Sequence, residues 1–504
     1  GRSRDHGRLG CFDQVFDFQG FNTSGVEDFR LVFQADVIDA LAQGRDLAHA
    51  FVHDGLRAEH AGVLLHGGSD VVGYILRVLA FGGVVQACDA GQGEVSRICR
   101  QALVSGGFVE FDDVVARSAA EYQQVEQRVG AQAVGAVDQS VLRYSRALSL
   151  APTNETALYN LSTLHMGTGE LNEALRGFER VKRIHPSHAK SMWNGGLVRL
   201  SLGEFQRGWA DYQWRFEVKP QDRTIDTDNT FDATRDLTAR VLVWGEQGVG
   251  DEVMFGSMLR EFRGWCGKML VQMDKRLIPL FRRSLPQDVE FYERGSVVSE
   301  DLYDSHIPIG SLGLHLRPSR ESFEGHRGAY LKADADRVRA LRESFGLTDG
   351  ERLIGVSWRS SNPETGAGRS LPLWELAQVL GGEGRRLVNL QYGSVQEEIA
   401  EAQARCGIRV EQVPGVDCQN DLDGLAALIM ACDEVVSIGN ATAHLAGALG
   451  QKTTVLLPYS PSWRWTTVGK ETPWYRSLLL LRQHASDEWA GLLDEAQRQL
   501  VATG

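Results

Sequence analysis

The pattern of apolar and polar positions divides the later part of the chain into short strands and intervening helices. Short apolar runs bounded by glycine or polar turns are typical of buried strands. They occur at residues 239–244, 268–272, 289–292, 306–308, 353–357, 434–438 and 453–457. Because helical segments separate the runs, the pattern indicates parallel sheets covered by helices. It predicts two α/β halves at 239–335 and 336–504, the second closed by a C-terminal helix.

A helical repeat at 138–218 precedes these halves. Pro152 and Pro186 are 186 − 152 = 34 residues apart, which is the period of the tetratricopeptide repeat, a pair of packed helices. Gly169 falls in the expected turn between the two helices, but Leu158 stands where that family usually has tryptophan. The helix-packing positions in this register are Leu158, Leu161, Ala174 and Phe178. The segment resembles the tetratricopeptide family, although helical hairpins that bind no ligand would show the same pattern.

Aromatic residues gather at the end of this repeat and again near the C-terminus. The first group comprises Phe205, Trp209, Tyr212, Trp214 and Phe216. The second comprises Trp463, Trp465, Trp474 and Tyr475, interleaved with Arg464, Lys470 and Arg476. Large aromatic side chains usually supply packing area, so we expect both groups to pack between parts of the protein. The stretch at 219–238 is polar, and we expect it to be a linker.

The first 137 residues have a composition unlike the rest of the chain. Pro is absent before Pro152 and Lys before Lys182, and Met and Trp are absent before Met166 and Trp193. Average chains contain about 5% Pro. Either residues 1–137 form a domain of unusual composition, or a GC-rich gene has been read in the wrong frame, which is the interpretation we favour. We assign this segment no fold.

Charge and cysteine content narrow the class of protein. The formal net charge of −13 argues against nucleic acid as the main partner, because counterion release at phosphates needs a basic surface. The seven cysteines are scattered without a C-x-x-C pair, which suits a reducing compartment and offers no zinc or disulfide framework. No apolar run reaches the roughly 18 to 20 residues needed to cross a bilayer. We therefore expect a cytoplasmic protein with no membrane span.

Two segments are candidates for chemistry. After the strand at 434–438, a small-residue helix is predicted at 442–449, with its N-terminus at the carboxyl end of the strand, where α/β sheets bind anions. His444 is the only ionisable side chain between Glu434 and Lys452. A phosphate-bearing ligand would fit there, but a tightly packed structural helix with a structural histidine would also explain the pattern.

The second candidate is the turn GEQGVGDE, which follows the strand at 239–244. Its glycines, Gly245, Gly248 and Gly250, allow a sharp turn and a close approach to a ligand. Asp251 at the start of the next helix either caps that helix or acts in catalysis. The order of the glycines is not that of the dinucleotide-binding fingerprint.

Several motifs occur together in a fixed order. They are GEQGVGDE, SWRSS, GRSLPL, NLQYG, NDLDGLAALIMACDEVVS, NATAHLAGALG and SWRWTTVGKETPWYRSLLLLRQ. With the repeats, the chain over about residues 138–490 resembles the bacterial tetratricopeptide-linked glycosyltransferases, whose catalytic region is similar to heptosyltransferases. The resemblance implies a fold class of α plus α/β: a short helical array followed by a GT-B fold of two Rossmann-like halves facing a cleft.

The resemblance also implies roles for particular residues. Asp251, after Gly250, would be the general base for the acceptor hydroxyl, and metal ligands are not implied. The implied donor-binding residues are Gly248, Gly250, Arg359, Arg369, Gln391, Asn440, Thr442 and His444. Gly439 and Asn440 depart from the Asp-Thr pair usual in relatives, so the phosphate contact would use the Asn amide and backbone N–H groups. Alternatively, Arg359 and Arg369 are surface charges and Gln391 only satisfies a strand end.

The sequence thus supports two hypotheses of different classes. The first is an inverting, metal-independent glycosyltransferase without a cofactor, which uses a nucleotide sugar as co-substrate and holds a protein or glycan acceptor on its repeats. The second is a non-catalytic scaffold whose repeats recruit partners and whose glycosyltransferase-like region is degenerate.

Overall fold

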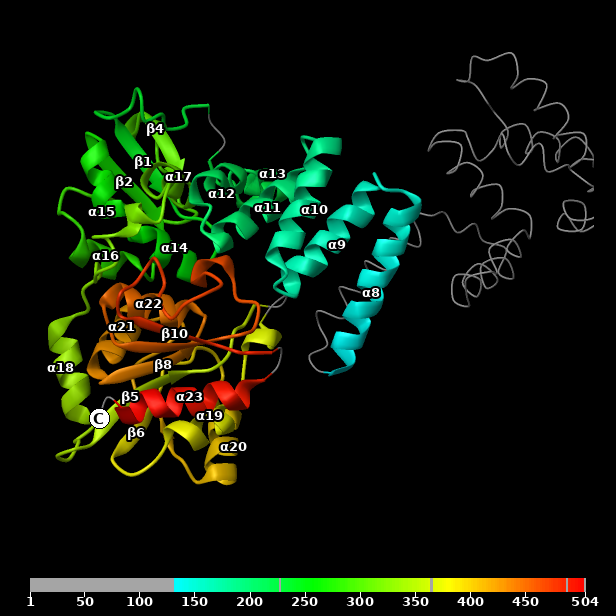
Figure 1. The fold of residues 1–504 in the computed structure, drawn as a ribbon. Coiled ribbons are helices and arrows are strands. Elements are labelled where there is room, and N and C mark those ends of the chain that lie inside the picture. Colours follow the sequence, from blue (N-terminus) through cyan, green and yellow to red (C-terminus); the bar gives the residue numbers. More distant parts are fainter. Residues whose placement is uncertain (1–130, 226–227, 363–365, 486–487, 503–504) are drawn as a thin grey trace, which may run out of the picture. The chain divides into compact units, whose positions relative to one another are not determined.

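The computed structural model describes residues 131–225, 228–362, 366–485 and 488–502. All of them belong to one structural unit, Arg117–Gly504. Most of the segment that the sequence left without a fold, 1–137, lies outside the described residues. The described chain forms a helical array followed by two α/β halves (Figure 1), so the predicted succession of helices and parallel sheets is confirmed.

The helical array consists of antiparallel helices that repeat at the predicted spacing. Its helices are α8 (Ala131–Leu150), α9 (Glu155–Gly167), α10 (Leu171–Ile184), α11 (Ala189–Leu202), α12 (Phe205–Tyr212) and α13 (Arg215–Val218). The starts of α9 and α11 are 189 − 155 = 34 residues apart, and those of α10 and α12 are 205 − 171 = 34 apart. Ala174, Phe178 and Val198 form a buried core between these helices. Helix α8 begins at Ala131, ahead of the boundary expected at 138.

The first half is built on a parallel sheet with the order β3-β2-β1-β4 in the described chain. Its strands are β1 (Arg240–Trp244), β2 (Lys268–Met273), β3 (Glu290–Glu293) and β4 (Ser305–Pro308). Its helices are α14 (Val249–Gly256), α15 (Leu259–Phe262), α16 (Ile278–Ser284) and α17 (Leu312–Leu316). The expected linker is more than a polar loop, because Phe231 is buried and Thr230 forms a parallel bridge with His306 of β4.

The second half is built on a parallel sheet with the order β10-β9-β8-β5-β6-β7 in the described chain. Its strands are β5 (Arg352–Ser357), β6 (Arg385–Asn389), β7 (Val410–Glu411), β8 (Glu434–Ile438), β9 (Thr453–Leu457) and β10 (Leu478–Arg482). Its helices are α18 (Ala335–Ser344), α19 (Leu373–Leu380), α20 (Gln396–Cys406), α21 (Leu422–Ala431), α22 (Ala441–Leu449) and α23 (Trp489–Ala502). Helix α23 packs against α19 and β10 of this half (Figure 1).

A continuous hydrophobic core joins the end of the helical array to both halves. Trp209 of α12 is fully buried and donates its indole N–H to the carbonyl of Arg317, at 2.8 Å, in the first half. The same indole packs edge to face on Trp463, with ring centroids 5.6 Å apart, and on Trp474, 6.5 Å apart, from the second half. The expectation that these aromatic residues pack between parts of the protein is confirmed. None of the described helices combines the length and apolarity needed to cross a membrane.

Candidate functional site

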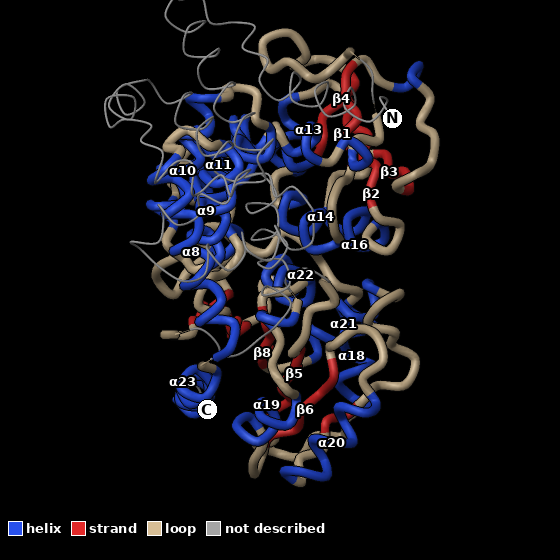
Figure 2. Tube along the Cα trace, turned by 90° about the vertical axis from the view of Figure 1, so that its right-hand side faces the viewer, coloured by secondary structure: helices blue, strands red, loops and turns tan. Residues whose placement is uncertain are grey.

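The two segments that the sequence singled out meet at their helix N-termini. Helix α14 of the first half contacts α22 of the second half, and Figure 2 shows the two helices facing each other where the halves meet. A Cβ atom on Gly250 would lie 3.2 Å from His444 Cδ2 and 3.4 Å from the Cα of Ala441. Glycine at position 250 therefore permits the close approach of the two helices.

Asp251 binds an arginine from the other half. Its Oδ2 accepts a hydrogen bond from the backbone N–H of Gly248 at 3.4 Å, which caps α14. Its Oδ1 accepts one from Nε of Arg464 at 2.6 Å and lies 2.5 Å from Nη2 of the same guanidinium. Arg464 belongs to a short 3₁₀ helix, η8 (Trp463–Trp465), that follows β9. The Asp251 carboxylate thus serves both as a helix cap and as half of an ion pair between the halves.

Arg369 brings a second guanidinium close enough to interact electrostatically with this ion pair. It ends the 3₁₀ helix η7 (Ala367–Arg369). Its pKa is lowered to about 10, mainly by burial and also by the positive charge of Arg464, against the opposing effect of the negative charge of Asp251. Within the described part of the chain, no acceptor is recorded for the Arg369 guanidinium. Two guanidiniums thus act electrostatically on one carboxylate, only that of Arg464 in direct contact with it, so the positive charge exceeds the negative charge among these three side chains.

Gln247 links this charge cluster to the helical array. Its Nε2 donates to the hydroxyl of Tyr212 in α12 at 2.5 Å, and its Oε1 accepts from Nη2 of Arg464 at 3.4 Å. Gln247 has a φ of 60°, which is unfavourable for a residue with a side chain. A strained residue of this kind persists only where its surroundings hold it and is found preferentially at functional sites.

His444 lies beside the cluster but is enclosed by aromatic rings. Its Nδ1 is 3.1 Å from the hydroxyl of Tyr475, and its ring stacks on Trp465 with centroids 4.5 Å apart. Burial, assisted by the positive charge of Arg464, lowers the pKa of His444 to about 3. The imidazole is therefore neutral at physiological pH, so it brings no positive charge to a phosphate.

Asn440 and Thr442 fasten the start of α22 to the sheet. Asn440 Oδ1 accepts the N–H groups of Thr442, at 3.0 Å, and Ala443, at 3.3 Å. Its Nδ2 donates to Ser357 Oγ at 2.8 Å, and Thr442 Oγ1 donates to the carbonyl of Leu390 at 3.4 Å. These two backbone N–H groups, which the sequence offered to a phosphate, thus already have an acceptor in Asn440. We therefore regard both residues as supports of the site.

Glycine at position 439 also has a steric reason. A Cβ atom at this position would lie 2.7 Å from Nε1 of Trp465. Glycine at 439 therefore leaves room for the indole that stacks on His444. Packing thus accounts for glycine at 439, and helix capping accounts for asparagine at 440.

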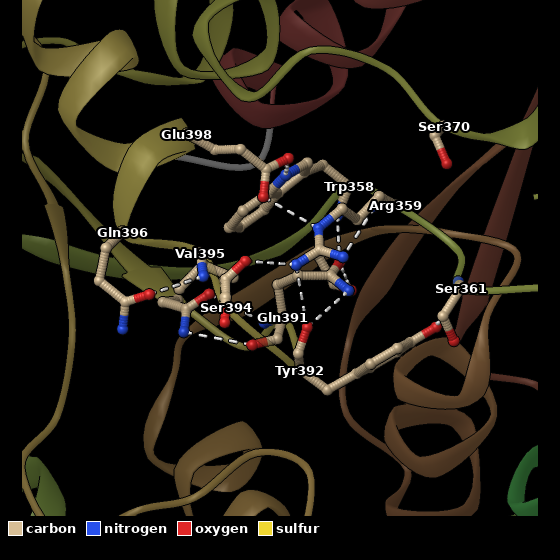
Figure 3. Close-up of polar contacts among 12 residues, drawn as sticks. Trp358, Arg359, Ser361, Ser370, Gln391, Tyr392, Ser394, Val395, Gln396 and Glu398 are labelled. Carbon is tan, nitrogen blue, oxygen red and sulfur yellow. Dashed lines mark hydrogen bonds and ion pairs between the residues drawn. The ribbon is translucent and has the colours of Figure 1, made fainter. Parts of the chain in front are cut away.

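Gln391 and Arg359 belong to a satisfied polar cluster at the ends of β5 and β6 (Figure 3). Gln391 Oε1 accepts three hydrogen bonds of 3.0 Å, from Ser357 Oγ and from the backbone N–H groups of Trp358 and Arg359. The Arg359 guanidinium is bound by Glu398, with Nε to Oε2 at 2.9 Å, and by the carbonyl of Ser394, at 2.6 Å from Nη2. Its charge is already compensated, so this geometry favours a structural role for both residues.

Sequence reasoning missed three residues at or next to the site: Arg464, Gln247 and Glu252. Arg464 stands in a segment, SWRWTT, whose mixture of basic and aromatic residues is also compatible with a surface for a polyanion, but we assigned the segment to packing and did not single out its arginine. Glu252, next to Asp251, is fully buried, and its Oε1 lies 2.7 Å from Nη1 of Arg294. Burial raises the pKa of Glu252 to about 7, against the opposing effect of Arg294. Among the described residues, no group of three or more His, Cys, Asp or Glu side chains gathers in a way that could hold a metal ion.

The fold and site define a two-halved α/β protein with a helical array and a basic cluster where the halves meet. The chain is similar to Protein FlbA of Caulobacter vibrioides, with 32% identity over 370 residues, covering 68% of this chain and 61% of that protein. The chain therefore spans less than two thirds of the length of this relative. No protein-family model matches the chain.

Solved structures with low overall superposition also match part of the chain. The glycosyl transferase family 9 protein of Veillonella parvula has a TM-score of 0.39 and 13% identity, covering 54% of this chain and 97% of that one. The ADP-heptose heptosyltransferase II of E. coli has a TM-score of 0.37 and 16% identity, covering 52% of this chain and 98% of that one.

Proposed function

We propose that the chain is an inverting glycosyltransferase that moves a sugar from a nucleotide-sugar donor to an acceptor hydroxyl. One observation carries the proposal. The Asp251 carboxylate of the first half forms an ion pair with the guanidinium of Arg464 from the second half, and the Arg369 guanidinium interacts electrostatically with both. Glycosyl transfer from a nucleotide sugar requires a base on one side of the anomeric carbon and positive charge on the departing diphosphate.

The reaction follows from these groups. The acceptor oxygen attacks the anomeric carbon from the face opposite the diphosphate, and its proton passes to the Asp251 carboxylate. The new carbon–oxygen bond forms as the bond to the diphosphate breaks, and the electron pair leaves on the diphosphate oxygen. Arg369 and Arg464 stabilise this developing negative charge. Attack from the opposite face inverts the anomeric configuration.

The same proposal assigns parts to the other predicted residues. Gly248 and Gly250 shape the turn that brings α14 against α22, and Arg369 binds the diphosphate. Gln391, Asn440, Thr442 and neutral His444 form the wall that supports the donor. Because guanidiniums supply the positive charge, transfer proceeds without a metal ion, and activity in excess EDTA would match that in buffer.

The helical array is assigned to acceptor binding. Its 34-residue period is that of tetratricopeptide repeats, which present extended surfaces to other macromolecules. We propose that the array binds a protein or glycan acceptor. We also propose that the protein acts in the cytoplasm, with a nucleotide sugar as its co-substrate.

The test is transfer and hydrolysis of a panel of nucleotide sugars, read by mass spectrometry. The Asp251→Asn variant is expected to lose transfer by at least about a hundredfold, the usual contribution of a general base, while it still binds nucleoside diphosphate. Unchanged turnover in this variant would refute the assignment of Asp251 as the base.

A second function, a non-catalytic scaffold, is favoured by one observation: Asp251 is already bound by Arg464. Thermal shift separates the two functions, because a donor that binds only the folded state raises its stability in proportion to RT ln(1 + [L]/Kd). A scaffold would show no shift with any nucleotide sugar.

A further inference from the structure

The ion pair between Asp251 and Arg464 occupies the group that the reaction needs as a base. Both Nε and Nη2 of Arg464 are directed at Oδ1 of Asp251, at 2.6 and 2.5 Å. The third nitrogen, Nη1, donates to Ser462 Oγ at 2.9 Å. With Oδ1 contacted by two guanidinium nitrogens, this carboxylate oxygen is blocked from receiving a hydrogen bond from an acceptor hydroxyl.

We propose that Arg464 changes partner when the donor binds: it holds Asp251 in the unliganded protein and the donor diphosphate in the complex. The donor thereby uncovers its own general base. This inference rests on the proposed function and adds to it a change of partner at Arg464 and an order of events. Asp251 becomes available only after the donor has bound, so the donor binds before the acceptor reacts.

The charges around Arg464 favour the exchange. Burial lowers its pKa, but Asp251 and Tyr212 more than offset this and raise it above its ordinary value, so the guanidinium stays charged. A diphosphate offers more negative charge and more acceptor oxygens than one carboxylate. Arg369, which has no acceptor among the described residues, attracts the diphosphate to the same place.

The surroundings of Arg464 hold its backbone in place but leave its guanidinium able to change partner. The neighbouring Trp463 is clamped by Trp209 and Tyr212 of the array, with ring centroids 5.6 and 5.8 Å away. The Arg464 guanidinium lies 4.8 Å from the Trp463 ring centroid, and the Arg464 side chain is 22% exposed. A change of partner therefore requires rotation of the side chain and no movement of the helices.

A double-mutant cycle on nucleoside diphosphate affinity tests the exchange. Calorimetry would measure the dissociation constants of ADP, UDP, GDP, CDP and dTDP with wild type, Asp251→Asn, Arg464→Gln and the double variant. Loss of a charged hydrogen bond predicts weaker binding by roughly tenfold or more in Arg464→Gln. Asp251→Asn is expected to tighten binding several-fold, because it frees Arg464, but to have a much smaller effect in the Arg464→Gln background.

The controls separate this inference from the proposed function. Arg476→Gln, at an exposed position of the same C-terminal segment, is expected to bind like wild type, and Arg464→Lys to recover part of the lost affinity. If the wild type binds a nucleoside diphosphate and Arg464→Gln binds it equally well, Arg464 only holds the two halves together. That result would overturn the exchange of partner but not the proposed transferase activity. If Asp251→Asn had the same effect on affinity in both backgrounds, Asp251 would act only by repelling the charge of the diphosphate. That result would also overturn the exchange of partner. Failure of the wild type to bind any of the five would overturn the proposed function and the inference together.

Discussion

The amide of Gln247, in the first half, donates a 2.5 Å hydrogen bond to the hydroxyl of Tyr212 in the helical array. The oxygen of the same amide accepts from Arg464, which holds Asp251. Four residues from all three parts of the protein are thus connected in a row. The array is therefore part of the structure that positions the proposed site, in addition to any role in binding an acceptor.

Removal of the Tyr212 hydroxyl should weaken donor binding. Tyr212→Phe keeps the buried ring but leaves Gln247 Nε2 without this acceptor, so Arg464 loses part of its orientation. We expect a several-fold higher KM for the nucleotide sugar with a smaller change in kcat, in line with the loss of one hydrogen bond of about 1 kcal/mol. Tyr159→Phe is the matched control, since the Tyr159 hydroxyl accepts a hydrogen bond from Asn194 within the array. Equal kinetics for the two variants would show that the row does not position Arg464.

The array is fastened to the first half by a buried ion pair. Nε and Nη2 of Arg215 each lie 2.7 Å from the Glu246 carboxylate, and the two side chains are 4% and 0% exposed. Removal of one partner leaves a buried charge without compensation, so Arg215→Ala should lower the free energy of unfolding by roughly 3 to 5 kcal/mol. Arg235→Ala, in an exposed pair with Asp232, should leave it nearly unchanged, because solvent screens exposed ion pairs. Chemical denaturation measures both, and similar losses would contradict the difference in burial.

The two arginines that the sequence proposed for the donor should behave differently. Arg369→Gln removes a guanidinium with no described acceptor and is expected to weaken nucleoside diphosphate binding by roughly tenfold at unchanged melting temperature. Arg359→Gln breaks the pair with Glu398 and is expected to lower the melting temperature with little change in affinity. Calorimetry and thermal melts on both variants give the comparison. If instead Arg359→Gln weakened nucleoside diphosphate binding and Arg369→Gln lowered the melting temperature, Arg359 would be the donor-binding residue.

Strands β8 and β9 were predictable because both are buried on both faces. Strands β8 and β9 coincide with the apolar runs predicted at 434–438 and 453–457, and every residue in them is buried. Helix α22 begins at Ala441, one residue before the predicted start, because Asn440 is its N-cap. Local signals of this kind do not depend on the rest of the chain.

The composition of the site was only partly predictable. The glycine turn and the small-residue helix marked Asp251 and His444, since each motif is local. Arg464 lies 213 positions from Asp251 in sequence, and only the packing of the two halves brings it there. The sequence likewise gave no means to distinguish Arg359 from Arg369, because the difference lies in Glu398, which reaches Arg359 from α20.

The stability of the protein should fall as pH rises between about 4.5 and 7 because of Glu252. Burial raises its pKa in the folded protein from 4.5 to about 7, and the facing groups are Arg294, Asp274 and Asp251. In this interval the folded state holds a proton on Glu252 that the unfolded state has released. The free energy of unfolding is therefore highest below the ordinary pKa of 4.5 and decreases as the pH rises through the folded-state pKa of about 7. The difference corresponds to roughly 3 kcal/mol. Glu252→Gln cannot ionise and should not show this loss.

The measurement is the melting temperature of Glu252→Gln relative to wild type from pH 5 to pH 8. The variant loses an acceptor for Arg294 or for the backbone N–H of Asp274, which each lie 2.7 Å from the carboxylate, so it begins at a disadvantage. That disadvantage is nearly independent of pH, whereas the cost of ionising Glu252 in the wild type grows with pH. The difference in melting temperature should therefore move in favour of the variant as pH rises. Glu397→Gln, at an exposed position of α20, should show no such trend, and a constant difference for Glu252→Gln would mean that this carboxylate is already ionised at pH 5.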